Sequence, residues 1–309
     1  MRVAVFGAGG IGAYFGGRLA LAGAEVHLIA RGAHLEALRR DRLRVLSTKA
    51  DFEIVLPAAD DPRDVGPVDF VLFTVKSRDT AAAAARLGPL LHPDTAVVSL
   101  QNGLGNVETI AAAAGPRHTM GGVAYLLSTI AEPGLVVHSA GPATVIFGEL
   151  DGRRSDRASR LLDALRTAGV DATLSEEIWR SIWDKFVFIC ALSGMTAAVR
   201  LPIGDIRSVP DSWQMFRDVL HEVAAVASAE GVVLSDDAIG RHEALAQALE
   251  PGTFSSLHHD LTTGKPMELE ALQGELVRRA RNHGVAVPAT EALYAILRPW
   301  AVHNASPDH

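Results

Sequence analysis

Residues 2–23 read RVAVFGAGGIGAYFGGRLALAG, and this stretch decides the fold class of the N-terminal half. It opens with a short apolar run of the kind that forms a buried strand. Glycines follow directly, and the residues after them carry apolar side chains at helical spacing as far as Gly23, a residue type that commonly ends a helix. A buried strand, a glycine turn and a helix in succession predict the first βα unit of a parallel sheet.

The same alternation continues over the first 115 residues. Apolar runs typical of strands, each followed by a helical stretch, occur at 25–31, 70–76 and 95–103. Such apolar strands separated by helices indicate a parallel sheet that is covered on both faces. Residues 117–150 are richer in glycine and β-branched residues, which predicts a meander that continues the edge of the sheet. A helix at 156–168 and a short strand at 170–175 complete this half.

Strand signals almost vanish after residue 176. The later stretches with helical periodicity are EEIWRSIWDKFVF, SWQMFRDVLHEVAAVASAEG, DAIGRHEALAQAL, ELEALQGELVRRARNHG and TEALYAILRPWAVH. We therefore predict an α/β domain with a mostly parallel sheet over residues 1–176, followed by an all-α domain over residues 177–309. The final segment, HNASPDH at 303–309, is expected to fray.

The composition excludes several classes of protein. The chain has 309 residues, 48% of them hydrophobic, and a formal net charge of −7, which argues against nucleic-acid binding. No run of about eighteen or more apolar residues is present, and the N-terminus begins at once with a strand instead of a signal peptide. The single cysteine, Cys190, lies in an apolar run, which favours a buried position and a reducing compartment. We expect a cytoplasmic protein that acts on a small molecule, without nucleic-acid or membrane partners.

The glycine turn after the first strand carries a nucleotide-binding pattern. Gly7, Gly9 and Gly12 form G-x-G-x-x-G between a strand and a helix, which is the context that dinucleotide binding requires. Free N–H groups at the start of the helix would then face the pyrophosphate. The alternative is a purely structural glycine turn. The residues predicted to bind the cofactor here are Gly7, Gly9, Gly10, Ile11 and Gly12.

The end of the second strand distinguishes between two dinucleotides. Sites for NAD usually place an acidic residue there, where it bonds the ribose 2′-hydroxyl. In this sequence HLIAR ends in Ala30 and Arg31, without a carboxylate. A guanidinium suits a 2′-phosphate, so we predict NADPH (NADP+) as the cofactor. The alternative is that Arg31 is a solvated loop residue.

Two more polar residues follow strands at the carboxyl edge of the predicted sheet, where ligands bind in such folds. TVKSRD contains Lys76, and SLQNGLGN contains Asn102. Either side chain is a candidate to contact the ribose or the phosphates of the cofactor. Each is also open to a simpler interpretation as an ordinary turn residue.

One lysine interrupts the apolar stretch SIWDKFVFICALSGM at 181–195. The chain has 29 basic residues, but its lysines are only Lys49, Lys76, Lys185 and Lys265, so a retained lysine suggests a task that arginine does not perform. Burial lowers the pKa of an amine towards the range in which it exchanges protons. Lys185 is therefore either a catalytic acid or a side chain that reaches from a helix end to solvent.

Together these motifs resemble those of the ketopantoate reductase (2-dehydropantoate 2-reductase) family. The resemblance also rests on residues 255–288, SSLHHDLTTGKPMELEALQGELVRRARNHGVAVP, and covers essentially the whole chain. It implies a Rossmann domain followed by a helical domain similar to that of 6-phosphogluconate dehydrogenase. It also implies NADPH-dependent reduction of 2-dehydropantoate to pantoate, a step of pantothenate biosynthesis.

The resemblance implies a role for individual residues. Lys185 matches the general acid of the family, and Glu268 matches a residue of its substrate pocket and is a second catalytic candidate. Ser256 matches a ligand of the substrate carboxylate. Asn102 matches an asparagine near the nicotinamide ribose and the lysine, so it is a candidate for both cofactor and substrate binding. Lys76 matches the lysine on the cofactor side.

Three positions depart from the asparagines that the family usually has. Ile189 and Ser193 occupy the positions four and eight residues after Lys185, and Ile203 occupies a third. Helical spacing aligns the first two with Lys185. We therefore predict a more apolar pocket wall than in the family, with Ser193 as a remaining substrate ligand.

Three hypotheses about function follow. The first is reduction of 2-dehydropantoate, and the second is reduction of a different, less polar 2-oxo acid, as the isoleucines favour. The third is a protein that binds NADPH as a sensor without catalysis. The sequence does not determine the number of subunits, and a homodimer is one of the options.

Overall fold

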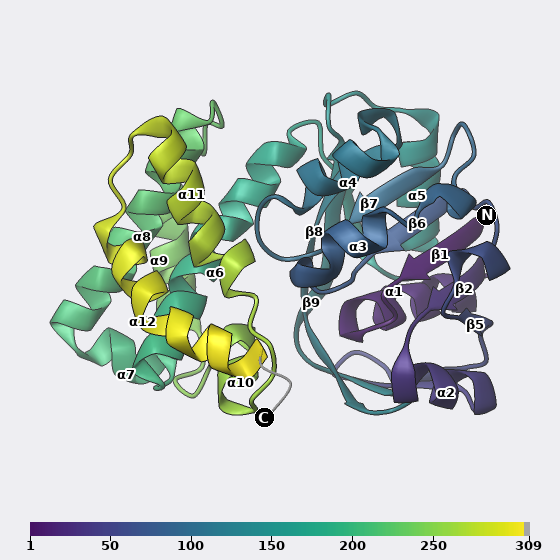
Figure 1. Cartoon of the computed structure of the whole chain (residues 1–309), viewed down its shortest axis with the longest axis horizontal. Helices are drawn as coiled ribbons and strands as arrows, with labels where there is room; N and C mark the ends of the chain where they lie inside the picture. The colour runs from purple at the N-terminus through teal and green to yellow at the C-terminus, as the bar shows by residue number, and fades with distance from the viewer. Residues whose placement is uncertain (306–309) are drawn as a thin grey trace. The chain divides into compact units, whose positions relative to one another are not determined.

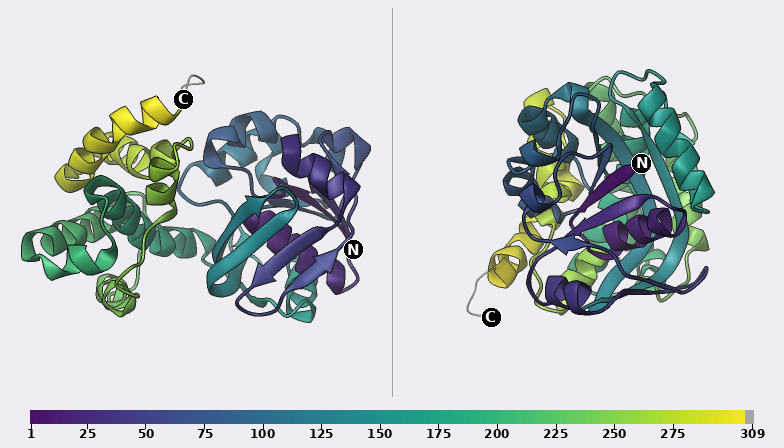
Figure 2. Two further views of the ribbon diagram at one scale, coloured as in Figure 1. Left: turned by 90° about the horizontal axis from the view of Figure 1, so that it is seen from below. Right: turned by 90° about the vertical axis from the view of Figure 1, so that its right-hand side faces the viewer.

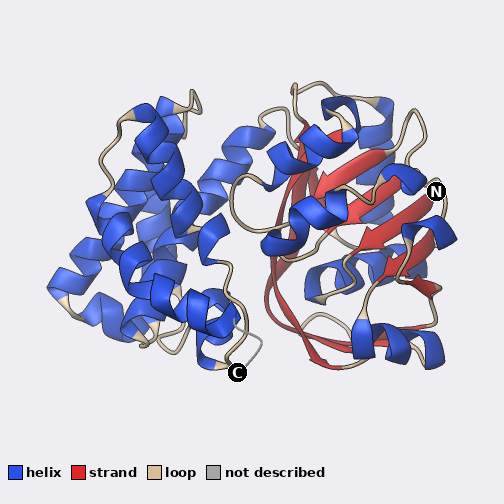
Figure 3. Cartoon of the chain, viewed as in Figure 1, coloured by secondary structure: helices blue, strands red, loops and turns tan. Residues whose placement is uncertain are grey.

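The computed structural model describes residues 1–305, which form two compact units. The first unit comprises Met1–Gln101 and Asn106–Ser181, and the second comprises Asn102–Gly105 and the described residues from Ile182 onward. Within the described residues all strands belong to the first unit, whereas the second is helical (Figures 1 and 3). The predicted order, an α/β domain with a mostly parallel sheet followed by a helical domain, is confirmed.

The first unit is built on one sheet of ten strands within the described residues, in the order β4-β3-β9-β8-β7-β6-β1-β2-β5 with β10 beside β9. The central strands β2, β1, β6 and β7 are parallel to their neighbours, whereas β3 and β4, and β8 and β9, are antiparallel. The bounds are β1 (Arg2–Phe6), β2 (Glu25–Ile29), β3 (Leu43–Ser47), β4 (Phe52–Ile54), β5 (Ala58–Ala59), β6 (Phe70–Phe73), β7 (Ala96–Ser99), β8 (Thr119–Glu132), β9 (Leu135–Glu149) and β10 (Asp171–Leu174).

Helices cover both faces of the central strands because successive side chains point to opposite faces. Val3 and Val5 of β1 pack with one apolar cluster, to which α1 (Gly10–Leu21), α2 (Gly32–Arg40) and α5 (Asp156–Thr167) contribute. Ala4 and Phe6 pack with a second cluster, to which α3 (Thr80–Ala84) and α4 (Asn106–Ala114) contribute. The sheet is therefore buried on both sides, as its continuous apolar strands predict.

The predicted meander at 117–150 is a long hairpin of β8 and β9, 14 and 15 residues in length, which Figure 2 shows in teal. Short strands that the sequence analysis did not predict flank it or close the other edge: β3, β4 and β5. Of these, β4 and β5 have only three and two residues, too few to carry a recognisable strand pattern.

The second unit consists of helices around an apolar core. The elements are α6 (Ile178–Val199, in this unit from Ile182 onward), α7 (Ile203–Ser208), α8 (Pro210–Ala229), α9 (Ala238–Ala248), α10 (Ser256–Thr262), the short 3-10 turn η5 (Leu269–Ala271), α11 (Gln273–His283) and α12 (Pro288–Ala305). Because α12 continues to Ala305, the predicted fraying does not begin at residue 303, and its remainder, 306–309, lies outside the described residues.

Helix α6 is long and apolar enough to cross a bilayer by length and composition, the one such helix among the described residues. However, 61% of its most apolar window is buried inside the protein. The buried part includes Cys190, whose thiol pKa is raised by burial. A mostly buried apolar helix is what the core of a water-soluble protein contains, so the composition of α6 is weak support for a membrane span.

Candidate active site

The glycine turn after β1 has the geometry of an anion-binding loop. Gly7 has a φ of +99°, and a Cβ there would lie 2.7 Å from the Val75 backbone nitrogen. At Gly12 a Cβ would lie 2.4 Å from Thr74 Oγ1, so this glycine allows α1 to pack against the strands. Gly9 has no neighbour closer than 4.0 Å to an added Cβ. It caps α1 without a side-chain hydrogen bond, so a ligand has room to approach the N–H groups there.

The other two residues of the loop are explained by packing. A Cβ at Gly10 would lie 2.3 Å from the carbonyl oxygen of Ser128 on β8, so the long hairpin requires this glycine. Ile11 packs against the apolar cluster on its face of the sheet. Binding of the cofactor by Gly10 and Ile11 stays a prediction.

Two cationic residues follow the ends of β2 and β6. Arg31 directly precedes α2 and its side chain is 77% exposed, with Nη2 2.6 Å from Asp79 Oδ2. Lys76 is exposed and immediately precedes the 3-10 turn η2 (Ser77–Asp79) that carries this aspartate. Arg31 therefore contacts the turn that follows Lys76. This arrangement places the guanidinium in solvent but also orients it.

A polar network that the sequence analysis did not identify holds the loop after β6. Gln101 donates from Nε2 to the Val75 carbonyl oxygen at 2.9 Å and to Thr80 Oγ1 at 2.7 Å. Thr80 Oγ1 in turn donates to Asn106 Oδ1 at 2.9 Å. The side chain of Gln101 thereby fixes the peptide that leads into Lys76. In the sequence, the one indication of this network is that the polar residue Gln101 directly precedes Asn102.

In the second unit the structure brings together three predicted residues. Lys185 Nζ donates to Asn102 Oδ1 at 2.6 Å. Burial lowers the pKa of the half-buried Lys185 to about 8, and the negative charge of Glu268 partly opposes this shift. The result is an amine that is mostly protonated at neutral pH and can still release its proton.

The backbone around Asn102 explains the sequence QNGLG. Gly103 has a φ of +89°, and a Cβ there would lie 2.3 Å from the Ala271 carbonyl oxygen. The Leu104 backbone N–H donates to the same oxygen at 3.2 Å. Ala271 belongs to η5, the turn that directly follows Glu268. Glu268 therefore caps the short turn whose last residue, Ala271, holds the loop that presents Asn102.

The structure places Ser256, the predicted ligand of the substrate carboxylate, away from Lys185. Ser256 is exposed at the start of α10, and the buried Ser255 caps this helix by accepting a bond from the His258 N–H at 3.1 Å. Ser255 Oγ also lies 2.7 Å from Thr196 Oγ1 on α6. Thr196 is eleven residues after Lys185, or about 16 Å along the helix axis. Ser256 therefore lies towards the other end of α6 from Lys185.

The three residues that replace the family's asparagines differ in burial. Ile189 is half-buried on α6, and Ser193 is 4% exposed. Ile203 is 0% exposed at the start of α7, in the helical core. The protein's own atoms enclose Ile203 and almost enclose Ser193, so a contribution of either side chain to a substrate pocket stays a prediction.

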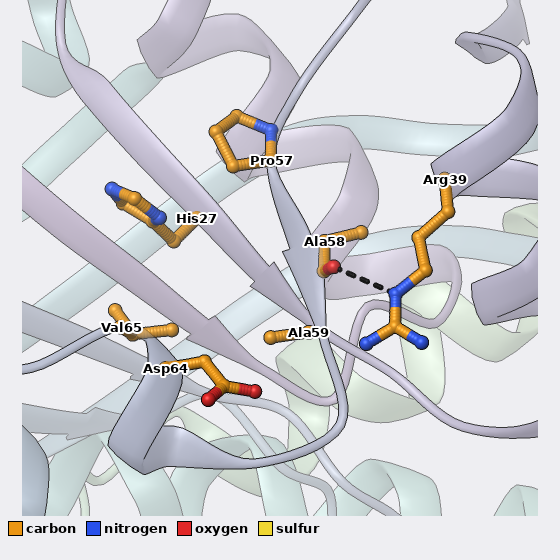
Figure 4. Close-up of a pocket in the computed structure, with 7 residues that line it drawn as sticks. All are labelled: His27, Arg39, Pro57, Ala58, Ala59, Asp64 and Val65. Atoms are coloured by element: carbon orange, nitrogen blue, oxygen red, sulfur yellow. Dashed lines mark hydrogen bonds between the residues drawn. The ribbon is translucent and has the colours of Figure 1, made fainter.

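Two open pockets lie away from all these residues. Figure 4 shows one of about 220 Å³ beside β2 and β5, where Arg39 Nε donates to the Ala58 carbonyl oxygen at 3.1 Å. It is lined by His27, Arg39, Pro57, Ala58, Ala59, Asp64 and Val65. The other, of about 560 Å³, is lined by Met215, Asp218, His221, Glu222, Pro288 and Ala289. In the part of the chain that the structure describes, no group of three or more histidine, cysteine or acidic residues is arranged to hold a metal.

A βα unit with an open glycine loop, together with a lysine of lowered pKa, is typical of dinucleotide-binding oxidoreductases. Comparison with known proteins identifies the group within this class. The model described as "Ketopantoate reductase PanE/ApbA" matches residues 3–152, and that described as "Ketopantoate reductase PanE/ApbA C terminal" matches residues 177–301. The chain therefore belongs to the ketopantoate reductase family.

Individual relatives agree with this assignment. The 2-dehydropantoate 2-reductase of Halobacterium salinarum is 33% identical, over 96% of this chain and 98% of that protein. A crystal structure of a PanE/ApbA family ketopantoate reductase from Ralstonia eutropha is 35% identical with a TM-score of 0.91, over 99% of this chain and 100% of that one. The 2-dehydropantoate 2-reductase from Geobacter metallireducens is 31% identical with a TM-score of 0.90, over 97% and 99% of the two chains.

Proposed function

We propose that this protein reduces 2-dehydropantoate to pantoate with NADPH and that Lys185 is the general acid. The observation that carries the proposal is the hydrogen bond from Lys185 to Asn102, at an amine whose pKa is lowered to about 8. Relatives named 2-dehydropantoate 2-reductase, 33% identical over nearly the whole chain, support the choice of substrate.

The chemistry requires a proton donor. NADPH, when bound, supplies a hydride to the 2-oxo carbon, so that negative charge develops on the carbonyl oxygen. A group that donates a proton or a strong hydrogen bond to this oxygen lowers the barrier. At a pKa of about 8 the Lys185 amine is an ammonium in roughly nine molecules of ten at pH 7. Asn102 orients the ammonium, and the negative charge of Glu268 favours its protonated form.

The residues of the first unit fit the cofactor. The glycine loop leaves space at Gly9 for a pyrophosphate, and no carboxylate follows β2 to bond a free ribose 2′-hydroxyl. The exposed Arg31 offers a guanidinium for a 2′-phosphate, which would compete with Asp79 for it. Lys76 is a second cation for the phosphates. These features support NADPH over NADH.

The proposal also includes the cellular compartment of the protein and its partners. The free, fully buried Cys190 is compatible with a reducing compartment, so we place the enzyme in the cytoplasm. Its partner is a small 2-oxo acid. Formation of a homodimer stays a prediction.

A second candidate, reduction of a less polar 2-oxo acid, is favoured by one observation. Ile189 lies one helical turn after Lys185 on α6 and is half-buried. Its side chain cannot bond a substrate hydroxyl, and a site without such a partner loses discrimination for that hydroxyl. A sensor without catalysis is disfavoured, since it needs no amine with a lowered pKa.

A substrate panel tests these alternatives. We would measure oxidation of NADPH and of NADH in parallel with 2-dehydropantoate and with 2-oxo acids that lack its hydroxyl. The proposal expects the highest kcat/KM for 2-dehydropantoate with NADPH. A preference for the apolar acids would support the second candidate, and Ile189→Asn should then shift the preference towards 2-dehydropantoate. Tight NADPH binding without turnover on any acid would contradict both.

A further inference from the structure

The loop Asn102–Gly105 is supported on its second side by a carboxylate. Gly105 has a φ of +83°, and a Cβ there would lie 3.2 Å from Glu275 Oε1 and 3.4 Å from its carboxyl carbon. Glu275 belongs to the first turn of α11, and its side chain is only 12% exposed. The carboxylate therefore packs directly on the backbone of Gly105.

Two arginines hold this carboxylate in place. Arg279 Nε donates to Glu275 Oε1 at 2.8 Å, and Arg278 Nε donates to Oε2 at 2.9 Å. Arg279 is itself buried, with its side chain 11% exposed. Because a nearly buried carboxylate is stable only with such partners, the pairing fixes the position of Glu275.

Arg279 connects the cluster to the helix that carries Lys185. Its Nη1 lies 2.5 Å from Glu230 Oε2, and its guanidinium carbon lies 5.9 Å from the centre of the Trp183 ring. Trp183 is 2% exposed and is two residues before Lys185 on α6. Glu275 thus contacts the loop of Asn102, while its partner Arg279 contacts α6.

We propose that Glu275 is a positioning residue which, held by Arg279, fixes the loop Asn102–Gly105 so that Asn102 Oδ1 stays against Lys185 Nζ. Its kinetic consequence rests on the proposed function, but the positioning itself does not. Nothing in the sequence pattern marks Glu275, which reads as a surface carboxylate of an amphipathic helix.

The consequence for Lys185 has a definite sign. A hydrogen bond from the ammonium to Asn102 stabilises the charged form, so loss of that bond lowers the pKa of Lys185 further. Among the described residues, the negative charge of Glu268 raises the pKa of the ammonium, in the same direction as the bond to Asn102. Removal of Glu275 should therefore lower the pKa of Lys185 below about 8 by freeing the loop.

The four lysines of the chain make this measurable. NMR of the protein labelled with ¹³C at the lysine Cε positions gives four resonances, which Lys→Arg variants assign. Lys185 should titrate at a lower pH in Glu275→Ala and in the more conservative Glu275→Gln. The matched control is Glu291→Gln. It removes an exposed ion pair of 3.0 Å with Arg281, which lies on α11 like Glu275, and it should leave the titration of Lys185 unchanged.

A direct effect of the lost charge has to be separated from positioning. In the background of Asn102→Ala the acceptor is already gone, so Glu275→Gln should no longer change the titration of Lys185. An equal shift with and without Asn102 would overturn the proposal, because the carboxylate would then act through its field. No shift of Lys185 in any Glu275 variant would overturn it as well.

Kinetics provide the second readout. In the folded Glu275→Gln variant kcat should fall about 10- to 100-fold while the KM for NADPH stays unchanged, because misplacement acts on the reacting group. A wild type that turns over no 2-oxo acid would contradict the proposed function but leave the NMR titration decisive. If the wild type reduces 2-oxo acids and kcat is unchanged in Glu275→Gln, the positioning role of Glu275 is contradicted and the proposed function is not.

Discussion

Lys185 Nζ and Asn102 Oδ1 lie 2.6 Å apart although the two residues are 83 positions apart in the chain. Because an ammonium can only donate, the atom of Asn102 that faces it is the oxygen, and the amide group is thereby oriented. A lysine in an apolar helix is either a catalytic acid or a side chain that reaches solvent. The hydrogen bond of its nitrogen to Asn102 favours the first interpretation.

Replacement of the lysine should abolish turnover without loss of the cofactor. We expect Lys185→Ala and Lys185→Arg to lower kcat by about 10²- to 10⁴-fold, since alanine has no proton to give and arginine does not release one. The Kd for NADPH, measured by fluorescence titration, should change little because Arg31 and the glycine loop belong to the other unit. Wild-type turnover in either variant would remove Lys185 from the mechanism.

The pH dependence of the reduction should follow the same amine. A general acid must be protonated, so kcat for reduction should fall as the pH rises through about 8, the lowered pKa of Lys185. The charge of Glu268 raises this pKa, and Glu268→Gln should therefore move the alkaline limb to lower pH. A pH–rate profile of both proteins measures this. A limb that stays in place in Glu268→Gln would show that Glu268 does not act on the amine.

The lowered pKa also predicts how stability depends on pH. Between about 8 and 10.5 the unfolded chain keeps the proton of Lys185 while the folded chain has lost it, so the free energy of unfolding contributed by this residue rises with pH. At pH 7 the folded protein carries the cost of a half-buried ammonium. Lys185→Met should then raise the Tm at pH 7, and the difference should shrink above pH 8. A lower Tm for Lys185→Met at pH 7 would contradict the burial cost.

A substitution that disturbs the backbone of the Asn102 loop should lower turnover as strongly as a replacement of the Asn102 side chain. We expect Gly103→Ala to lower kcat strongly, because a Cβ would lie 2.3 Å from the Ala271 carbonyl oxygen and would displace Asn102. Gly23→Ala is the matched control, since Gly23 has a similar φ of +93° but no atom within 4 Å of an added Cβ. Both should lose some stability in thermal melts. If both variants kept full turnover, the loop would not position Asn102.

Replacement of Arg31 tests the choice of cofactor. Arg31→Gln should raise the KM for NADPH by about tenfold or more and leave the KM for NADH nearly unchanged, because only NADPH has a 2′-phosphate. Arg42→Gln, which removes another exposed arginine paired with Glu53 at 2.8 Å, is the control. Equal effects on both dinucleotides would mean that Arg31 does not recognise the 2′-phosphate.

Local patterns in the sequence were sufficient for the βα units, the glycine loop and the change to helices after residue 176. Strand and helix periodicity is a property of neighbouring residues, and G-x-G-x-x-G requires only a strand before it and a helix after it. The two-residue strand β5 was missed because it is too short to carry a pattern and its partner β2 is distant in the chain.

Only the tertiary structure decided which residues meet. The backbone of Ser128 on β8 leaves no space for a side chain at Gly10. Ser255 caps α10 beside Ser256, and Ile203 is enclosed in the helical core. Asn102 reaches Lys185 because its loop packs on Ala271. Hydrogen bonds, burial and the resulting pKa values depend on atoms brought together across long stretches of chain, and that proximity has no local signature in the order of residues.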